Sequence, residues 1–501
     1  MSSLPAIGSL NLPPLLGRVA AVLPDGIAAY AVGGMVRDVL LGRPSCDWDL
    51  AVSGGALRMA RRVADRLEGA YFPMDVEHDT ARVILHLEGG RRIHLDFAGL
   101  RGGGLDSDLQ ARDFTVNAMA VDIRQPEALL DPLGGLADLR AKRLRACSAT
   151  AMRDDPVRVL RGVRQAAALG FQIVSETRAQ MRAAVCGLPG ISPERQRDEL
   201  FKILGGPQPT PCLRALEFLG ALPYLLPELL LLKGVEQSLP HRADVWNHTL
   251  DVVSALGEIL AALSPHYDPD RANNLTLGLL VLRLGRFRAS LHEHFAVSLN
   301  TDRTLRPLLF LAALYHDIAK PLVRTQDADG RIRFLEHELL GADTVACRAR
   351  AFHLSNAETE RLKQIVRGHM RPLLLAQEGL PTPRAVYRFF RDTGEAGVEI
   401  CLLSLADMLG TYGPALPQER WAALLDVIRV LLEAWWERPQ EAISPPALLN
   451  GHDLMQALKL SPGPQVGELL EAIREAQAMG TVTTREEAFA LAREAAAKTG
   501  R

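Results

Sequence analysis

Two aspartates, Asp47 and Asp49, follow a glycine pair near the N-terminus of this 501-residue chain. Gly33 and Gly34 come directly after the apolar run 27–32. Glycines at such a turn let backbone N–H groups approach a phosphate. Side chains two apart on an extended segment share a face, so the carboxylates can bind Mg²⁺, which prefers oxygen ligands and substrate phosphates. Such a metal activates an attacking hydroxyl and stabilises a leaving pyrophosphate, so the pattern predicts nucleotidyl transfer.

Further polar residues surround this pair in the sequence. Arg37 and Asp38 follow the glycines within one helical turn, where a guanidinium can fork onto a phosphate. Asp96 lies on the alternating segment 92–97 and is either a third carboxylate or a surface residue of an edge strand. A glycine pair and an Asp-x-Asp pair are each common alone. Their order and close spacing carry the prediction.

A second set of residues combines histidines with aspartates. His316 and Asp317 follow an apolar helix, and His248, His337, His369 and Asp407 lie on other expected helices. This order resembles the HD phosphohydrolase superfamily. Imidazoles with carboxylates suit a divalent transition metal, Mn²⁺, Fe²⁺, Ni²⁺ or Zn²⁺, which would activate a water for attack on a phosphate ester. The alternative is a helical body that only supports RNA. We assign five other histidines to packing or surface roles: His241, His266, His292, His294 and His353.

The elements that position these residues change in type along the chain. Residues 1–140 read as mixed α/β, with strands expected over 27–32, 49–52, 81–87 and 92–97 and a helix over 56–67. From about residue 152 the chain reads as helical, over 156–169, 194–204, 245–263, 304–319, 338–353, 357–369 and 419–437. The stretch 264–303 has an irregular composition and is expected to be an insertion. Domain boundaries are therefore expected near 150, near 205–211 and near 439–446.

Composition sets the class of protein. Hydrophobic residues make up 48% and charged residues 23%, as in globular proteins. A chain of 501 residues is too long for a single hydrophobic core, so several domains are expected. Six scattered cysteines without a CxxC pair indicate a reducing compartment, and no signal peptide or apolar run of membrane length is seen. We expect a cytoplasmic protein with no membrane contact. The net charge is −2, yet residues 141–215 carry 13 Lys and Arg against 6 Asp and Glu, a local excess suited to RNA phosphates.

Five ordered motifs make the chain resemble a known family. GGMVRD and DWDL are followed by RDFTVNAMA with DPLGG, then DDPVRVLR and ERQRDEL. Together they resemble class II tRNA nucleotidyltransferases, the family of CCA-adding enzymes and bacterial poly(A) polymerases. The resemblance implies an α/β nucleotidyltransferase (polymerase beta-like) head over 1–150. It also implies an all-α neck over 151–210, an HD-type helical body over 211–438 and a helical tail over 439–501, in which Asp453 is expected to cap a helix.

The resemblance also implies roles for particular residues. Asp47 and Asp49 bind the catalytic Mg²⁺ ions, and Gly33, Gly34, Arg37 and Asp38 hold the nucleotide triphosphate. The sugar and phosphates are positioned by Arg112, Asp113 and Asn117. Asp155, Arg158 and Arg161 form the protein template that selects the base.

The template role has a chemical rationale. Asp155 and Arg158 are three residues apart and share a helix face. A carboxylate accepts from an exocyclic amino group while a guanidinium donates to the adjacent ring acceptor. Cytosine and adenine present this pattern, and uracil and guanine present its reverse. In the structural alternative Asp155 is an N-cap with Pro156 in the first helical position, and the two roles are compatible.

The expected activity is template-independent addition of C, A or both to the 3′ end of tRNA from CTP and ATP, with release of pyrophosphate. One departure from the family concerns the final A. Residues 97–104 are short and Gly-rich where members that add all three nucleotides carry a longer flexible loop. The open alternatives are poly(A) polymerase, a partial CC-adding or A-adding enzyme, chiefly an HD metal-dependent phosphohydrolase, and an RNA-binding module without activity.

Overall fold

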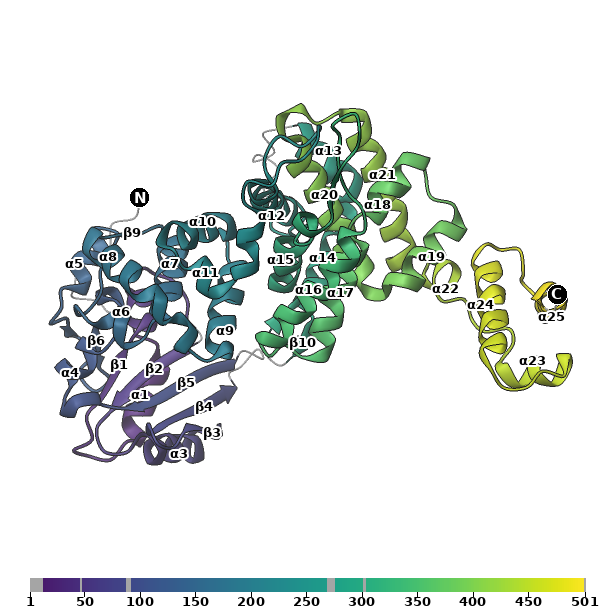
Figure 1. The fold of residues 1–501 in the computed structure, drawn as a ribbon. Helices are drawn as coiled ribbons and strands as arrows, with labels where there is room; N and C mark the ends of the chain where they lie inside the picture. The colour runs from purple at the N-terminus through teal and green to yellow at the C-terminus, as the bar shows by residue number, and fades with distance from the viewer. Residues whose placement is uncertain (1–11, 46, 87–91, 268–274, 301–302, 500–501) are drawn as a thin grey trace. The chain divides into compact units, whose positions relative to one another are not determined.

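The computed structural model describes residues 12–45, 47–86, 92–267, 275–300 and 303–499 (Figure 1). The chain forms two compact units. The first contains residues 1–199 and 214–225, and the second contains residues 200–213 and 226–501. Each unit is described by itself below. No helix among the described residues is long and apolar enough to cross a membrane.

A seven-stranded sheet in the order β3-β4-β5-β2-β1-β6-β7 forms the head. β2 and β5 run parallel, and the other neighbouring pairs are antiparallel. The strands are β1 (Ala29–Val32), β2 (Asp47–Val52), β3 (Ala70–Asp75), β4 (Thr80–His86), β5 (Arg92–Gly99), β6 (Ala120–Asp122) and β7 (Leu129–Leu130).

The two faces of this sheet differ in burial. Helix α3 (Ala56–Leu67) lies against β2, β3, β4 and β5 (Figure 1). Its buried apolar side chains recur at helical spacing. Val83, Leu95 and Phe97 are buried on one face of these strands, whereas the alternating residues Arg82 and Asp96 stay half-exposed. Strand alternation therefore leaves the polar face of β4 and β5 accessible.

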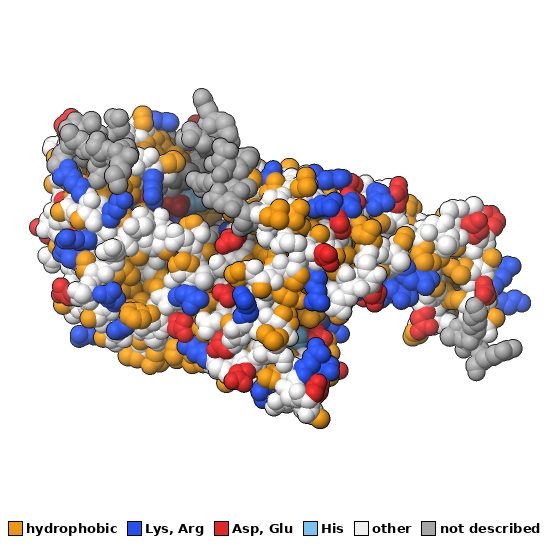
Figure 2. All heavy atoms as spheres, turned by 90° about the horizontal axis from the view of Figure 1, so that it is seen from above, with side chains coloured by type: hydrophobic (Ala, Val, Ile, Leu, Met, Phe, Trp, Pro, Cys, Tyr) orange, Lys and Arg blue, Asp and Glu red, His pale blue; other side chains and the backbone are white. Residues whose placement is uncertain are grey.

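The neck consists of short helices that follow the head. They are α6 (Ala151–Asp154), α7 (Arg158–Leu169), α8 (Ser175–Ala184), α9 (Pro193–Leu204), α10 (Pro209–Leu219) and α11 (Leu222–Leu225). Gly162 lets α7 approach the head, because a Cβ there would lie 2.8 Å from the Phe114 ring. Figure 2 shows one face of the whole chain, on which Lys and Arg side chains are interspersed with acidic and apolar ones.

The body is a bundle in the second unit. Helix α12 (Val245–Ala262) packs on α20 (Gly397–Tyr412), and α16 (His337–Ala351) packs on α17 (Asn356–Gly368). Helix α15 (Leu305–Tyr315) contacts α12, α16, α17 and α20, and all of its residues except Arg306 are buried. The surrounding helices are α13 (Leu275–Leu284), α14 (Arg288–Ala296), α18 (Arg371–Glu378), α19 (Pro383–Thr393) and α21 (Gln418–Trp436).

The C-terminal helices α23 (Gly451–Leu458), α24 (Pro464–Ala478) and α25 (Arg485–Thr499) enclose their own small apolar cluster. The expectation that Asp453 caps α23 is wrong. Asn450 is the N-cap and accepts from the Asp453 backbone, while the Asp453 side chain accepts from the Asn450 N–H at 3.0 Å. The motif is a capping box with Asp453 at its third helical position.

Two regions contain secondary structure that was not expected from the sequence, and the insertion at 264–303 stays a prediction. The stretch 264–303 contains α13 and α14, so the part of it that the structure describes is largely helical. Its prolines and asparagines obscured the apolar run that forms α13. Strand β3 was not expected, because Pro73 interrupts it and its side chains show no buried–exposed alternation.

Candidate functional site

Asp47 and Asp49 both lie on β2, in different surroundings. The Asp47 side chain is 77% exposed, and its Oδ1 lies 3.2 Å from Nδ1 of His94. Asp49 is far less exposed, and burial raises its pKa to about 6. Arg112 opposes this rise, whereas the Asp96 charge adds to it. Asp49 is therefore a candidate metal ligand, because a bound cation would favour its ionised form and offset the cost of burial.

Gly33 sits against Asp49 at the turn between β1 and α2 (Gly34–Leu40). Its φ is +78°, a conformation that side chains rarely adopt. A Cβ at this position would overlap the Asp49 Oδ2 atom and lie 3.3 Å from Nη1 of Arg112. The turn therefore requires glycine both for its backbone and for the position of the Asp49 carboxylate.

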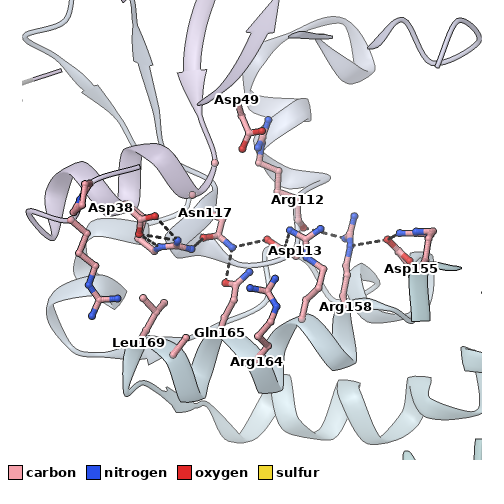
Figure 3. Close-up of a pocket in the computed structure, with 18 of the residues that line it drawn as sticks. Asp38, Asp49, Arg112, Asp113, Asn117, Asp155, Arg158, Arg164, Gln165 and Leu169 are labelled. Atoms are coloured by element: carbon pink, nitrogen blue, oxygen red, sulfur yellow. Dashed lines mark hydrogen bonds and ion pairs between the residues drawn. The ribbon is translucent and has the colours of Figure 1, made fainter. Parts of the chain in front are cut away.

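A continuous polar network leads from α2 to α7 (Figure 3). Arg37 donates to both oxygens of Asp38, at 2.9 and 3.0 Å, and from Nη1 to Asn117 Oδ1 at 2.6 Å. Asn117 Nδ2 donates to Asp113 Oδ1 at 3.0 Å and to Gln165 Oε1 at 2.9 Å. These bonds fix the guanidinium of Arg37 at the base of the site.

Asp113 is buried and stays charged. Burial opposes its ionisation, but Arg161, the Asn117 amide and the Phe114 N–H outweigh it and hold the Asp113 pKa below its ordinary value. Nη2 of Arg161 lies 3.1 Å from Asp113 Oδ2. Arg112, the neighbouring residue, donates from Nε and Nη2 to Asp108 at 3.0 and 2.9 Å. Both arginines are thus oriented by carboxylates.

Asp155 and Arg158 lie at the junction of α6 and α7. The expectation that they share a helix face is wrong, because Asp155 follows α6 in an extended conformation and Arg158 begins α7. Arg158 donates to the carbonyl oxygens of Ala111, Arg112 and Ala151, at 2.8 to 3.2 Å. Asp155 Oδ2 accepts from Arg195 Nη2 at 2.7 Å, while Asp155 Oδ1 is buried without a hydrogen-bond partner among the described residues. The N-cap expectation for Asp155 is wrong, because α7 begins at Arg158 and the Asp155 side chain caps no helix.

One pocket of about 570 Å³ collects most of the expected residues (Figure 3). It contains every expected nucleotide-binding residue and one of the two expected catalytic carboxylates: Gly33, Gly34, Arg37, Asp38, Asp49, Arg112, Asp113, Asn117, Asp155, Arg158 and Arg161. Asp47 lies outside this lining. Sequence reasoning missed Arg43, Arg101, Arg164, Gln165 and Arg195, which also line the pocket. The excess of arginine over carboxylate suits a triphosphate.

In the body, six expected ligands converge in two groups of three. One group is His248, His316 and Asp407, and the other is Asp317, His337 and His369. His248 Nε2 lies 3.1 Å from Asp407 Oδ1 and 3.4 Å from Asp317 Oδ2. His337 Nε2 lies 3.2 Å from Asp317 Oδ1 and 3.4 Å from His369 Nε2. All six residues are buried.

The imidazoles of this cluster are oriented by backbone carbonyls. Nδ1 of His316, His337 and His369 contacts the carbonyl oxygens of Ala313, Phe334 and Val366, at 2.7 to 2.8 Å. These contacts leave each Nε2 facing the centre of the cluster, the arrangement typical of metal-bound histidines. His316 Nε2 is buried 3.2 Å from Asp317 Oδ2 in an orientation that gives no hydrogen bond. The donor set and this orphaned nitrogen fit a divalent transition metal.

The charges in the cluster are strongly coupled. Burial opposes the imidazolium form of His248, but Asp317 and Asp407 outweigh it and raise the His248 pKa to about 9. Burial and the neighbouring His316 and His337 lower the pKa of His369 to about 3. Sequence reasoning missed Lys320, three residues after Asp317, whose Nζ lies 2.6 Å from Asp317 Oδ2.

Two histidines assigned to packing have defined contacts. The His241 ring centroid lies 5.1 Å from that of His248, beside the cluster, and burial lowers the His241 pKa to about 4. His294 Nε2 lies 3.1 Å from Oε2 of the buried Glu399, and Glu399 is not one of the six expected metal ligands.

Four family models match the chain. The model described as "Poly A polymerase head domain" matches residues 29–145, and "Probable RNA and SrmB- binding site of polymerase A" matches 170–232. The "HD domain" model matches 282–411, and "tRNA nucleotidyltransferase domain 2 putative" matches 445–492. The head and HD models imply dependence on divalent metal ions.

Curated relatives match over nearly the whole chain. The CC-adding tRNA nucleotidyltransferase of Geobacter sulfurreducens is 34% identical over 96% of this chain and 94% of its own length. The A-adding tRNA nucleotidyltransferase of Deinococcus radiodurans is 33% identical over 93% of this chain and 95% of its own length.

The fold also matches solved structures. The complex of a CCA-adding enzyme with ATP aligns with a TM-score of 0.58 and 21% identity, over 97% of this chain and 94% of that one. The Thermotoga maritima CCA-adding enzyme with tRNA aligns with a TM-score of 0.54 and 21% identity, over 96% and 94% of the two chains. The head is thus polymerase beta-like and is followed by an HD-type helical body. The arginine-lined pocket, the paired carboxylates and the near full-length relatives place this chain in the tRNA nucleotidyltransferase family.

Proposed function

We propose that this nucleotidyltransferase adds C residues from CTP to the 3′ end of tRNA and does not add the final A. The segment between β5 and Arg112 supports this reading. It is compact, with a 3₁₀ turn (Arg101–Gly103) and helix α4 (Leu105–Gln110), and Asp108 of α4 is bound to Arg112. The longer flexible loop of members that add all three nucleotides has no counterpart in this fully described segment.

The proposed transfer forms one phosphodiester bond. The 3′ hydroxyl of the RNA attacks the α-phosphorus of CTP, its proton leaves to solvent, and pyrophosphate departs. Asp47 and Asp49 would hold Mg²⁺, which would supply positive charge for the attacking and leaving oxygens. Arg37 and Arg112 bind the triphosphate, and Asn117 and Asp113 hold Arg37 and Arg161 in place. Asp155 and Arg158 read the amino and ring-acceptor edge of cytosine.

A nucleotide-by-nucleotide extension assay tests this activity. A tRNA lacking its CCA end is incubated with CTP or ATP alone, and a tRNA ending in CC is incubated with ATP. We expect two C additions with CTP and none with ATP on either RNA. Two C additions together with a single A on the CC end would indicate full CCA addition. A single A on the CC end without C addition would indicate an A-adding enzyme, and a long A ladder would indicate a poly(A) polymerase. The control is Asp47→Ala, which should lose transfer and keep the thermal unfolding curve of the wild type.

A second activity is favoured by the body. Six buried ligands in two groups of three support a metal-dependent phosphohydrolase at the HD cluster. A metal there would supply an activated water for attack on a terminal or 2′,3′-cyclic phosphate. The chain's own contribution is to present Nε2 of His316, His337 and His369 through their backbone-bound Nδ1 atoms.

The two activities separate by substitution. His316→Ala should abolish hydrolysis of a 2′,3′-cyclic phosphate and leave C addition intact, and Asp47→Ala should do the reverse. Loss of both in either variant would contradict two independent sites. A protein that binds RNA and consumes neither substrate would be a binding module only. We place the enzyme in the cytoplasm, because tRNA is its proposed substrate.

A further inference from the structure

Strand register brings the catalytic carboxylates into line with residues on three neighbouring strands. Asp49 on β2 pairs with Asp96 on β5. On the far side of β5, Asp96 pairs with Arg82 on β4. Arg82 in turn pairs with Phe72 on the edge strand β3. Directly paired residues of neighbouring strands share one face. The open face of the sheet therefore extends from the carboxylates to Phe72.

A second row runs beside the first. It leads from Asp47 through His94 and Ile84 to Ala70. His94 and Ile84 are half-exposed, whereas the residues of β4 and β5 between them, such as Val83 and Leu95, are buried on the other face. Phe72 is 47% exposed. Covering an aromatic ring removes apolar surface from water and is favourable, so an exposed ring here is a candidate binding surface.

The two substrates must approach the carboxylates from different sides. β2 lies between β1 and β5 in the sheet. The arginine-lined pocket is built from the β1–α2 turn, Arg112, Asn117 and α7, so it lies on the β1 side of Asp49. In-line displacement places the attacking oxygen opposite the leaving pyrophosphate. The RNA 3′ hydroxyl can therefore approach Asp47 and Asp49 from the β5 side.

Resting on the proposed transfer activity, we propose that the open face of β5, β4 and β3 binds the last nucleotides of the RNA acceptor, with Phe72 as a stacking surface for a base. Strand spacing of about 4.8 Å puts β3 about 14 Å from β2. Stacked nucleotides advance about 3.4 Å each, so a base over Phe72 lies about four steps before a terminal nucleotide at Asp49. The bases between them lie over the part of the face that carries Asp96, His94 and Ile84.

The test separates RNA binding from nucleotide binding. Phe72→Ser is compared with wild type in C addition to a tRNA lacking CCA, with the KM for RNA and the KM for CTP measured separately. We expect the KM for RNA to rise about 5- to 100-fold, as loss of one base-stacking contact predicts, and the KM for CTP to stay within about twofold. Phe72→Tyr keeps a ring at this position and should restore the wild-type KM for RNA.

A matched control lies next along the strand. Tyr71 points to the opposite face, where the Arg61 guanidinium lies 5.3 Å from its ring centre. Tyr71→Ser should leave the KM for RNA unchanged. An unchanged KM for RNA in Phe72→Ser, or an equal rise in Tyr71→Ser, would overturn the proposal.

A binding measurement distinguishes failure of this inference from failure of the transfer activity. An RNA hairpin with a single-stranded 3′ end carries 2-aminopurine near its terminus, whose fluorescence falls on stacking. We expect quenching by wild type and by Phe72→Tyr, and its loss in Phe72→Ser, with no CTP present. If wild type quenches but transfers no nucleotide, the binding surface stands and the transfer activity fails. If it transfers C and Phe72→Ser quenches equally, the surface is wrong and the activity stands.

Discussion

Asp96 lies beside Asp49 in the parallel register of β2 and β5, yet both of its carboxylate oxygens are bound by Arg82. Nε and Nη2 of Arg82 donate to Asp96 at 2.7 and 2.8 Å. The third acidic residue of the site is therefore engaged by a neighbouring strand rather than directed at a shared metal. Its charge still reaches Asp49, whose pKa it helps to raise.

Asp96→Asn should therefore change the pH dependence of transfer more than its maximal rate. Removing the negative charge lowers the pKa of Asp49 from about 6. Metal binding needs the ionised carboxylate, and transfer falls as pH decreases through that pKa, so the acid limb of the pH–rate profile should move to lower pH. Asp65→Asn on α3, with its carboxylate 62% exposed beside Arg61, is the control. A loss of more than about 100-fold at neutral pH would instead make Asp96 a metal ligand.

Gly33→Ala should lower the rate of transfer about 100-fold by moving the Asp49 carboxylate. The new Cβ would overlap Asp49 Oδ2 at a φ of +78°. Misplacing a reacting group by about 1 Å costs about 100-fold in rate. Gly26→Ala is a matched control, because its φ is +82° but nothing lies within 4 Å of an added Cβ. Both variants should lose stability in thermal unfolding because of the positive φ, Gly33→Ala more so because of the overlap, and only Gly33→Ala should lose C addition. Equal activity in the two variants would contradict this role.

Asp155→Asn should alter which base is accepted. The Asp155 carboxylate accepts from Arg195, and its second oxygen is buried and unpartnered among the described residues. An amide presents a donor in place of one acceptor, so it matches the carbonyl of uracil. We expect kcat/KM for CTP to fall about 10-fold or more and the relative use of UTP to rise. Asp154→Asn is the control, because that exposed carboxylate accepts from Thr150 outside the pocket lining. An unchanged ratio of UTP to CTP incorporation would exclude base reading by Asp155.

Much of this arrangement follows from local sequence patterns. Alternation predicted β4 and β5, and helical spacing predicted α3 over the same residues that the structure shows. The Asp-x-Asp spacing placed both carboxylates on β2, and the order of His and Asp residues anticipated the cluster in the body. These features depend on neighbours within a few residues of one another, which is the range that periodicity reports.

The contacts that were not predicted join residues far apart in the chain. Arg195 reaches Asp155 across 40 positions, and Gln165 reaches Asn117 across 48. From the local sequence alone, Arg195 and Gln165 look like ordinary residues on a helix surface. An N-cap role for Asp155 was the structural alternative because Pro156 follows it, but the Asp155 side chain accepts a hydrogen bond from Arg195 instead. Tertiary pairing overrode a local preference at this residue.

Metal binding at the HD cluster should release a proton and strengthen as pH rises. Without metal, Asp317 and Asp407 raise the pKa of His248 to about 9, so at neutral pH its imidazole is protonated. A metal ligand must be neutral imidazole, so binding displaces that proton, and affinity should rise about tenfold per pH unit up to pH 9. Calorimetric titration of the metal-free protein with Mn²⁺ at pH 6.5, 7.5 and 8.5, in buffers of different ionisation enthalpy, measures affinity and proton release together. His294→Gln, which changes a histidine paired with Glu399 instead, should leave both quantities unchanged. An affinity independent of pH over this range would show that His248 is neutral before the metal arrives, contrary to the charge that its two carboxylate neighbours impose.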